Sequence, residues 1–414
     1  MIDYKETELD NGLRLVTVHK PGKLFSMNLA IKVGALEEQP SEKGICHFIE
    51  HMLFKGTQKE TNASLNRKIE LLGGDFNAYT DYLSTVLTVS AMTEELPNAL
   101  TLLKDMVMNT HFLEEELEKE RSVILSELRA SLDDAEESTH RGLFDKAYDK
   151  SPLKQDVIGT EESVSSFTRE GLLAFYEKYY VPNNALLVLV SDLSHEKAVD
   201  ILKSTFSSWE KKPLKKRTIG FEKNIPGIYT AYKEMEQSSL AFLYSFELKE
   251  EEKLPLRVLN YKLGVSGNSI LFRELRENRG LAYDVYSDLE LSEPIRNLLL
   301  YTQVPDDRLE ETEELIFSIL EDIKRGAFIH EEDLLLMKKV LTTSIFSTLD
   351  HLGDLSAFLL DAVLNDEDPL AFQKDLERLK TLTLAEVVAV SKKIFTSPTI
   401  YRLRGDQDED HHRH

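Results

Sequence analysis

Cysteine is almost absent from this sequence: Cys46 is the single thiol in 414 residues. One thiol excludes an internal disulfide, so a reducing compartment is permitted though not required. We expect Cys46 to be a small buried residue and neither a ligand nor a nucleophile, because free cysteines are commonly buried. The length and the 42% hydrophobic content are ample for two or more globular domains with cores of their own.

Basic residues are fewer than acidic residues, with 50 Lys and Arg against 73 Asp and Glu, which gives a formal net charge of -23. This charge excludes a general nucleic-acid-binding protein, because phosphate binding needs a basic surface. The acidic excess would steer cationic peptide substrates toward the protein. It is equally explained as a means of keeping the protein soluble, and the charge alone does not decide between the two.

Long apolar runs are missing as well. No stretch reaches the roughly 20 apolar residues that span a bilayer, so we expect no membrane partner. Residues 1–7 have neither the basic start nor the apolar run of a signal peptide, which predicts a cytoplasmic location. Residues 406–414 are acidic and rich in histidine, and we expect a frayed terminus there in preference to a metal site.

The most informative motif is H-x-x-E-H at residues 47–51, the inverted order of the H-E-x-x-H zinc protease motif. On a helix, His47 and His51 lie one turn apart on one face and can bind the same metal ion. Glu50 lies beside that face and could act as a general base without being a ligand. Apolar residues in the same segment predict a core-facing stripe; these are Ile45, Phe48, Ile49, Met52 and Leu53. The alternative is two ordinary histidines on an amphipathic helix.

The chain also repeats itself. Residues 74–81 are similar to residues 280–287, and both follow a charged helical stretch and precede a predicted strand. A long amphipathic helix is then predicted at 94–109 and again at 308–325, followed each time by an aromatic residue and an acidic cluster. This order indicates duplication of one α/β unit.

The duplication predicts three parts of the chain. Residues 1–206 would form a catalytic, metal-binding half and residues 228–414 a homologous half without metal. Residues 207–227, which contain a basic run with proline, would form the linker. The second-half segment that corresponds to the histidine helix, 254–264, contains no histidine. We therefore expect one active site per chain, with the second half serving substrate binding or assembly.

A catalytic zinc ion usually has three protein ligands and one open position, so the two histidines need a partner. Glu120 and Glu127 are two helical turns apart and share a face. One carboxylate could complete the metal site while the other orients a histidine through its second nitrogen. Spacing alone does not choose among Glu115, Glu116, Glu120 and Glu127, and all four could simply be exposed charges.

These motifs resemble those of the pitrilysin superfamily of inverzincin metallopeptidases, peptidase family M16, and in particular its subgroup of enzymes like the mitochondrial processing peptidase. The resemblance covers essentially the whole chain. It implies that Glu127 is the third ligand, that Glu120 is an acidic residue supporting a histidine, and that each chain binds one Zn²⁺. One departure is residues 264–271, a looser form of the family's small-residue run.

The same resemblance implies where substrate binds. Gly74, Asn77 and Ala78 would belong to an edge strand that pairs with the substrate backbone. Arg276 and Tyr283, from the second half, would contact the substrate near the scissile bond. Because they are distant from the histidines in sequence, activity would require the two halves to close.

The resemblance further implies an α+β fold of two homologous halves, each a mixed, mostly antiparallel sheet with helices packed on one side. Two chains would form a homodimer around a closed chamber. The expected function is that of a zinc-dependent endopeptidase that hydrolyses short or unfolded peptides in that chamber. The alternatives are a processing peptidase that trims leader segments of proteins and a non-catalytic structural subunit of the same fold. The intact His47, Glu50, His51 and Glu127 argue against the last.

Overall fold

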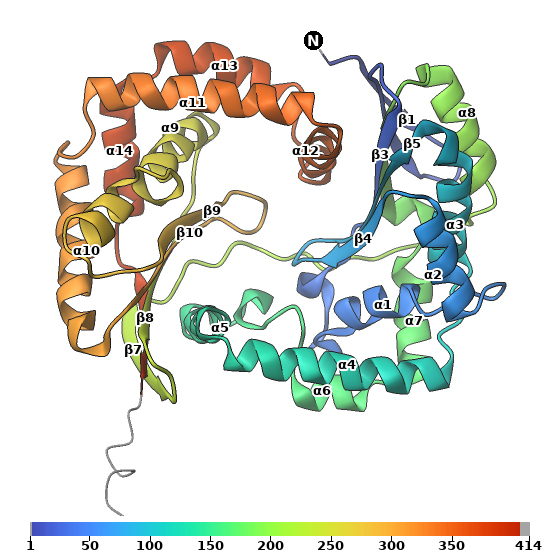
Figure 1. Ribbon diagram of the computed structural model, residues 1–414, viewed down its shortest axis with the longest axis horizontal. Helices are drawn as coiled ribbons and strands as arrows, with labels where there is room; N and C mark the ends of the chain where they lie inside the picture. Colours follow the sequence, from blue (N-terminus) through green and yellow to red (C-terminus); the bar gives the residue numbers. More distant parts are fainter. Residues whose placement is uncertain (1, 406–414) are drawn as a thin grey trace, which may run out of the picture. The chain divides into compact units, whose positions relative to one another are not determined.

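The computed structural model describes residues 2–405, which form two β-sheets with their helices (Figure 1). The chain divides into two compact units. The first consists of residues 2–129, Gln155–Thr218 and Phe346–Pro369. The second consists of Ala130–Lys154, Ile219–Ile345 and residues 370–405. The architecture is the predicted α+β fold with two homologous halves.

The first sheet is mixed and mostly antiparallel, in the order β1-β2-β6-β3-β5-β4. Among the described strands of this sheet, only β2 and β6 are parallel neighbours. Its strands are β1 Tyr4–Glu8, β2 Arg14–His19, β3 Leu24–Ile31, β4 Asp75–Thr80, β5 Thr85–Met92 and β6 Ala185–Ser191. The order places β4 at one edge of the sheet, paired with β5 alone.

The second sheet repeats this topology in the order β7-β11-β8-β10-β9, again with a single parallel pair, β7 and β11. Its strands are β7 Gly227–Lys233, β8 Ser238–Ser245, β9 Val285–Glu290, β10 Asn297–Val304 and β11 Thr399–Gly405. Read in chain order, these five occupy the places of β2 to β6 in the first sheet. The repeat extends to local backbone, since Phe112 and Phe328 both have positive φ shortly before a 20-residue helix.

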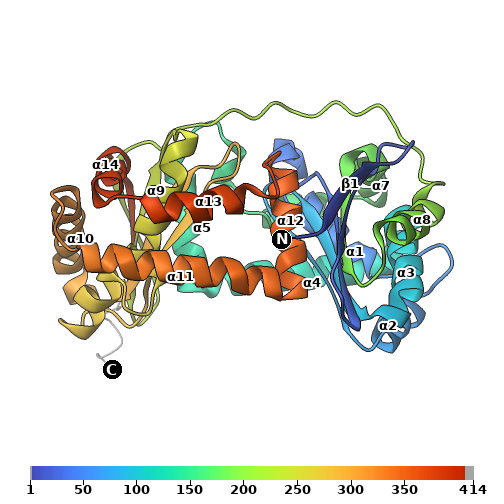
Figure 2. The same ribbon diagram turned by 90° about the horizontal axis from the view of Figure 1, so that it is seen from above.

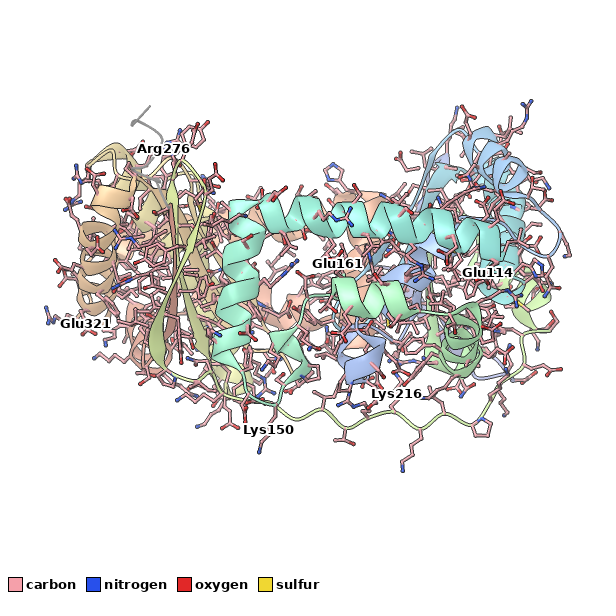
Figure 3. The ribbon with its side chains drawn as sticks, turned by 90° about the horizontal axis from the view of Figure 1, so that it is seen from below. Glu114, Lys150, Glu161, Lys216, Arg276 and Glu321 are labelled. Carbon is pink, nitrogen blue, oxygen red and sulfur yellow. The ribbon has the colours of Figure 1, made fainter. Side chains whose placement is uncertain are left out.

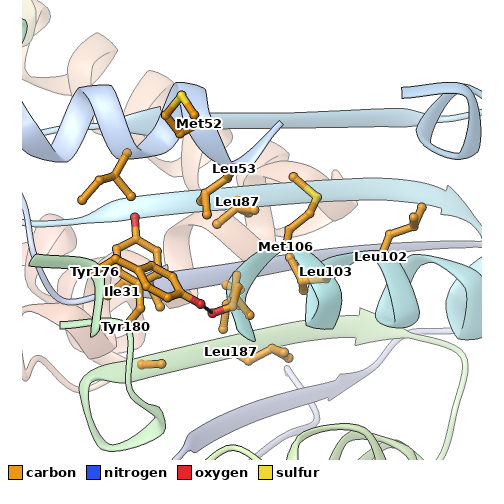
Figure 4. Packing of buried hydrophobic residues seen from close by; sticks show 14 of the residues in the cluster. Ile31, Met52, Leu53, Leu87, Leu102, Leu103, Met106, Tyr176, Tyr180 and Leu187 are labelled. Carbon is orange, nitrogen blue, oxygen red and sulfur yellow. Dashed lines mark hydrogen bonds between the residues drawn. The ribbon is translucent and has the colours of Figure 1, made fainter. Parts of the chain in front are cut away.

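The helices of the first unit form its main core with one face of the first sheet. They include α1 Ile45–Leu53, α2 Asn62–Leu71, α3 Leu96–Met108, α6 Glu161–Ser166, α7 Arg169–Tyr179 and α8 His195–Phe206, together with most of α4 Glu114–Asp133. Met52 and Leu53 of α1 pack near Leu87 of β5 and Met106 of α3 (Figure 4). The predicted apolar stripe of α1 is buried, and so is Cys46.

The helices of the second unit pack on the second sheet in a comparable way. They include α5 Ala135–Ala147, α9 Glu250–Asn260, α10 Leu309–Lys324, α13 Ala371–Thr381 and α14 Leu384–Ile394, together with most of α11 Glu331–Asp350. Short 3₁₀ and π-helical turns connect several of these elements. Within residues 2–405, no helix is both long enough and apolar enough to cross a lipid bilayer.

The face of each sheet that lies away from these helices is covered by one further helix. That helix comes from the other half of the chain in the predicted division. Helix α12, Leu352–Leu364, packs on β3 and β6 of the first sheet (Figure 1). Its buried side chains join the apolar side chains of the sheet in one cluster; they are Leu355, Leu359, Leu360 and Val363. Helix α5 packs on β8 and β11 of the second sheet. The helices are therefore not confined to one side of either sheet.

The compact units consequently do not follow the chain continuously. The division into 1–206, 207–227 and 228–414 remains a prediction about the repeat, while the compact units exchange α5 and α12. Residues 207–226 form neither helix nor strand (Figure 2). In the part that belongs to the first unit, the Lys216 ammonium donates to the backbone oxygen of Lys32 at 2.8 Å. Residues 406–414, for which we expected a frayed end, lie outside the described residues.

Candidate metal centre

Helix α1, which carries the H-x-x-E-H motif, has an N-terminus fixed by its own backbone geometry. Gly44 precedes the helix with φ of 90°, and a Cβ there would lie 2.4 Å from the backbone oxygen of Ile158, so only glycine fits. The carboxylate of Glu38 accepts hydrogen bonds from the backbone N–H groups of Gly44 and Cys46, both at 3.0 Å. Burial raises the pKa of Glu38 to about 7, against these two hydrogen bonds. The start of α1 is therefore held rigidly.

The structure brings His47, His51 and Glu127 together. One possible ligand atom from each lies within 4.8 Å of the others. Nε2 of His47 is 3.8 Å from Oε1 of Glu127, and Nε2 of His51 is 3.6 Å from Oε2. These distances are too long for hydrogen bonds. They are close to the roughly 3.4 Å that separates two ligands of a tetrahedral zinc ion with bonds of about 2.1 Å. Two imidazoles and one carboxylate are also a ligand set that zinc prefers, so these residues fit the ion.

Glu120 lies on the other side of His51. Its Oε2 is 2.9 Å from Nδ1 of His51, and its side chain is only 6% exposed, whereas the side chain of Glu127 is 48% exposed. This contact leaves Nε2 of His51 directed at Glu127. Glu127 therefore lies beside both histidines, and Glu120 lies behind His51.

The other two glutamates considered for this site face elsewhere. Glu115 and Glu116 both accept from the ammonium of Lys119, at 2.8 and 2.9 Å. Glu116 also accepts from the Asn62 amide at 2.7 Å. Both lie at the start of α4, near the labelled Glu114 in Figure 3. Their side chains therefore belong to surface ion pairs.

The two histidines are electrostatically unlike. Burial, together with the neighbouring His51, lowers the pKa of His47 to about 4, so its imidazole is neutral at pH 7. Burial also tends to lower the pKa of His51, but the hydrogen bond to Glu120 and the nearby carboxylates raise it overall. Nδ1 of His47 is buried and has no hydrogen-bond partner among the described residues. Of the two, His51 is therefore the one whose Nδ1 meets a carboxylate among the described residues.

Glu50 lies beside His47, His51 and Glu127 and is not one of the three converging residues. The Thr80 hydroxyl donates to Oε2 of Glu50 at 2.7 Å. Burial raises the pKa of Glu50, while this hydrogen bond and the charge of His51 oppose the rise. A raised pKa suits a carboxylate that takes up and returns a proton near neutral pH. Sequence reasoning assigned no role to Thr80, although it lies within residues 74–81, the motif that predicted the edge strand.

That edge strand, β4, contains two of the three residues expected to bind the substrate backbone. Its side chains alternate between more and less exposed, and Phe76 packs against Phe54 at the end of α1 with ring centroids 5.9 Å apart. The Asn77 side-chain oxygen accepts from the N–H of Ala78 at 3.0 Å. Gly74 precedes the strand, where a Cβ would lie 2.1 Å from the backbone oxygen of Ser90. The unpaired edge of β4 could accept an added strand.

Arg276 and Tyr283 lie in the second unit and contact each other. Nη1 of Arg276 donates to the backbone oxygen of Tyr283 at 2.9 Å, and its guanidinium lies 4.9 Å from the centre of the Tyr283 ring. Arg276 belongs to a π-helical turn, Phe272–Glu277, and is labelled in Figure 3. The ring of Tyr283 is free to meet another molecule, because the residue is 74% exposed. Contact of this pair with substrate stays a prediction.

Comparison with known proteins identifies the family. Residues 14–161 match the domain described as Insulinase (Peptidase family M16), and residues 166–341 match the Peptidase M16 inactive domain. The uncharacterized zinc protease YmxG of Bacillus subtilis is 31% identical over 334 residues, which cover 79% of this chain and 80% of that protein. The chain belongs to peptidase family M16. The inactive-domain match covers most of the half in which the segment equivalent to α1 has no histidine.

Other relatives of this M16 chain agree over its full length. An uncharacterized zinc protease of Rickettsia felis is 29% identical over 413 residues, covering 98% of both chains. The crystal structure of a protease from Helicobacter pylori has a TM-score of 0.92 and covers 98% of this chain and 100% of that one. At 23% identity, this likeness shows the shared fold alone. The family and the relatives' names support a metallopeptidase, without specifying what it cleaves.

Proposed function

We propose that this M16 chain is a zinc-dependent endopeptidase that hydrolyses short or unfolded peptides. One Zn²⁺ per chain would be held by His47, His51 and Glu127, with Glu50 beside it. The convergence of these three ligand atoms within 4.8 Å is the observation that carries the proposal. Glu120 would keep His51 oriented through its 2.9 Å contact with Nδ1.

The residues around the site suit peptide hydrolysis. A bound zinc ion would supply Lewis-acid chemistry there for a peptide carbonyl and a water molecule. Glu50 accepts the proton of the attacking water and returns it to the amine that leaves. The Thr80 hydroxyl holds one oxygen of Glu50, which leaves the other free to accept that proton. His47 and His51 take part in no proton transfer, and their role is to bind the metal ion.

Substrate would bind in extended form along β4. Gly74 and the backbone groups of Asn77 and Ala78 would contact the peptide, which would add as a further strand in a mode that tolerates many sequences. Arg276 and Tyr283 would complete the site from the second half when the two halves close. We further propose a cytoplasmic homodimer that encloses a chamber, with the acidic charge of the chain favouring cationic peptides.

The decisive experiment combines metal analysis with a fluorogenic peptide series of increasing length. We expect one zinc ion per chain, cleavage that a chelator abolishes and zinc restores, and rates that fall sharply for folded proteins. A protein that purifies without stoichiometric zinc and ignores chelators would be the structural subunit considered above. A single cut near the start of a precursor protein, with little cleavage of short peptides, would instead identify a processing peptidase.

A further inference from the structure

Glu120 is a buried carboxylate, and each of its two oxygens needs a hydrogen-bond or ion-pair partner. Its side chain is 6% exposed, and its Oε2 is occupied by Nδ1 of His51. Taking a charged carboxylate out of water is costly unless both oxygens are compensated. The second oxygen, Oε1, therefore needs a partner of its own.

Lys55 supplies that partner. Its ammonium lies 2.6 Å from Oε1 of Glu120, and its side chain is 26% exposed. Lys55 stands just beyond α1, where its backbone N–H donates to the backbone oxygen of Met52 at 3.1 Å. The lysine is thus attached to the same helix that carries both histidines. The result is a continuous chain of contacts, from the Lys55 ammonium through Glu120 to His51.

We propose that Lys55 is a positioning residue for the zinc site, acting through Glu120 on His51. By holding Oε1, it fixes the carboxylate so that Oε2 faces Nδ1 of His51. His51 then presents Nε2 to the ion, opposite Glu127. The inference concerns the metal site of the proposed function and extends it to a residue that does not touch the ion.

The arrangement also explains how two glutamates on one face of α4 keep different roles. Glu120 and Glu127 are two turns apart, so a Glu120 side chain free to rotate could compete for the ion. The ammonium of Lys55 holds it on the far side of His51. Without that charge, Glu120 would hold His51 less firmly and could become an alternative ligand.

The test measures zinc affinity in Lys55→Met, which keeps the length of the side chain and removes the charge. Changing groups that support metal ligands typically weakens metal binding by 10–100-fold, and we expect about tenfold for Lys55→Met. Lys55→Arg should retain most of the affinity, because it keeps a donor with the same charge. The matched control is Lys59→Met, since Lys59 pairs with the carboxylate of Asp105 at 3.1 Å, away from the histidines.

Zinc dissociation constants would be measured by competition with a chelator, and the Co²⁺-substituted proteins compared by visible absorption, which reports ligand geometry. We expect an altered spectrum and weaker binding in Lys55→Met alone, with the Tm of the metal-free protein kept. Unchanged zinc affinity in Lys55→Met would overturn the proposal, and so would a loss explained by a lower Tm. A wild-type protein that does not bind zinc would instead refute the proposed function, so the two failures are distinguishable.

Discussion

Replacing Glu50 with glutamine tests the assigned chemistry most directly. The amide oxygen of glutamine can still accept the hydrogen bond from Thr80 that Glu50 accepts at 2.7 Å. A neutral amide is also cheaper to bury than a carboxylate, so the fold should be at least as stable. Glu50 is not among the three converging ligand residues, so zinc binding should be kept. What the variant loses is a group able to take up a proton.

The size of the effect follows from that single loss. A positioned general base contributes about 10²–10⁴-fold, so kcat/KM should fall by that factor. At 1.36 kcal/mol for each factor of ten, this corresponds to roughly 3–5 kcal/mol of transition-state stabilisation. The loss should appear in kcat more than in KM, because the base acts on the reaction and not on substrate binding.

The assay is cleavage of a fluorogenic peptide by wild type and Glu50→Gln at equal, measured zinc content. Glu70→Gln provides a matched control, because Glu70 is an exposed glutamate on α2 of the same unit. A Glu50→Gln protein as active as wild type would refute the assignment of the base. A variant that loses its zinc would refute the separation between base and ligands.

Four further outcomes follow from the structure. Glu127→Ala should lose zinc in chelator competition while the Tm of the metal-free protein is kept, since the Glu127 side chain is 48% exposed; retained zinc would contradict its role. Gly74→Ala should lower the free energy of unfolding in urea by about 1–3 kcal/mol, because its Cβ would meet the Ser90 oxygen at 2.1 Å. Leu359→Ala should cost about 2–5 kcal/mol and speed hydrogen exchange in the first sheet, which its buried side chain covers. Burial raises the pKa of Glu38 in the folded protein to about 7 from a usual 4.5. The free energy of unfolding of wild type, relative to Glu38→Gln, should therefore fall as pH rises from 4.5 to 7. A difference between the two proteins in urea unfolding that does not change with pH would argue against this.

Local spacing was enough to place part of the candidate site. His47, Glu50 and His51 lie on one short helix, so helical periodicity alone predicts their arrangement. Glu127 was different, because the four candidate glutamates all lie along one helix, α4, and spacing could not rank them. What separates Glu120 from Glu127 is burial and the partners that each meets, which depend on the packing of α4 beside α1.

The residues that sequence reasoning missed depend on long-range contacts. Thr80 meets Glu50 across 30 positions of the chain, and Lys55 meets Glu120 across a larger gap. A threonine in a strand and a lysine after a helix carry no local signal of such roles. The resemblance to a family suggested which residues bind the metal, but only the three-dimensional packing pairs these side chains.

The sequence predicted part of the fold, as it predicted part of the candidate site. The repeated order of elements anticipated two sheets of the same kind, and the strand orders bear this out. The placement of α5 and α12 was not anticipated. An amphipathic helix reveals which of its faces is apolar but not which sheet will cover that face. Two halves with similar apolar sheets can therefore exchange a helix without any change in the hydrophobic periodicity of the sequence.

The position of α12 has a consequence for how the protein is made. The ribosome releases the strands of the first sheet early, yet the helix that covers one of their faces is Leu352–Leu364, which follows four strands of the second sheet in the chain. Domains usually fold as they emerge, amino-terminal first. Here the first unit stays without that cover, with Val16 and Val188 exposed, until Leu352–Leu364 has been synthesised. A product terminated before this helix would present the bare face of the sheet to other chains, so synthesis of α12 is itself a condition for a finished first unit.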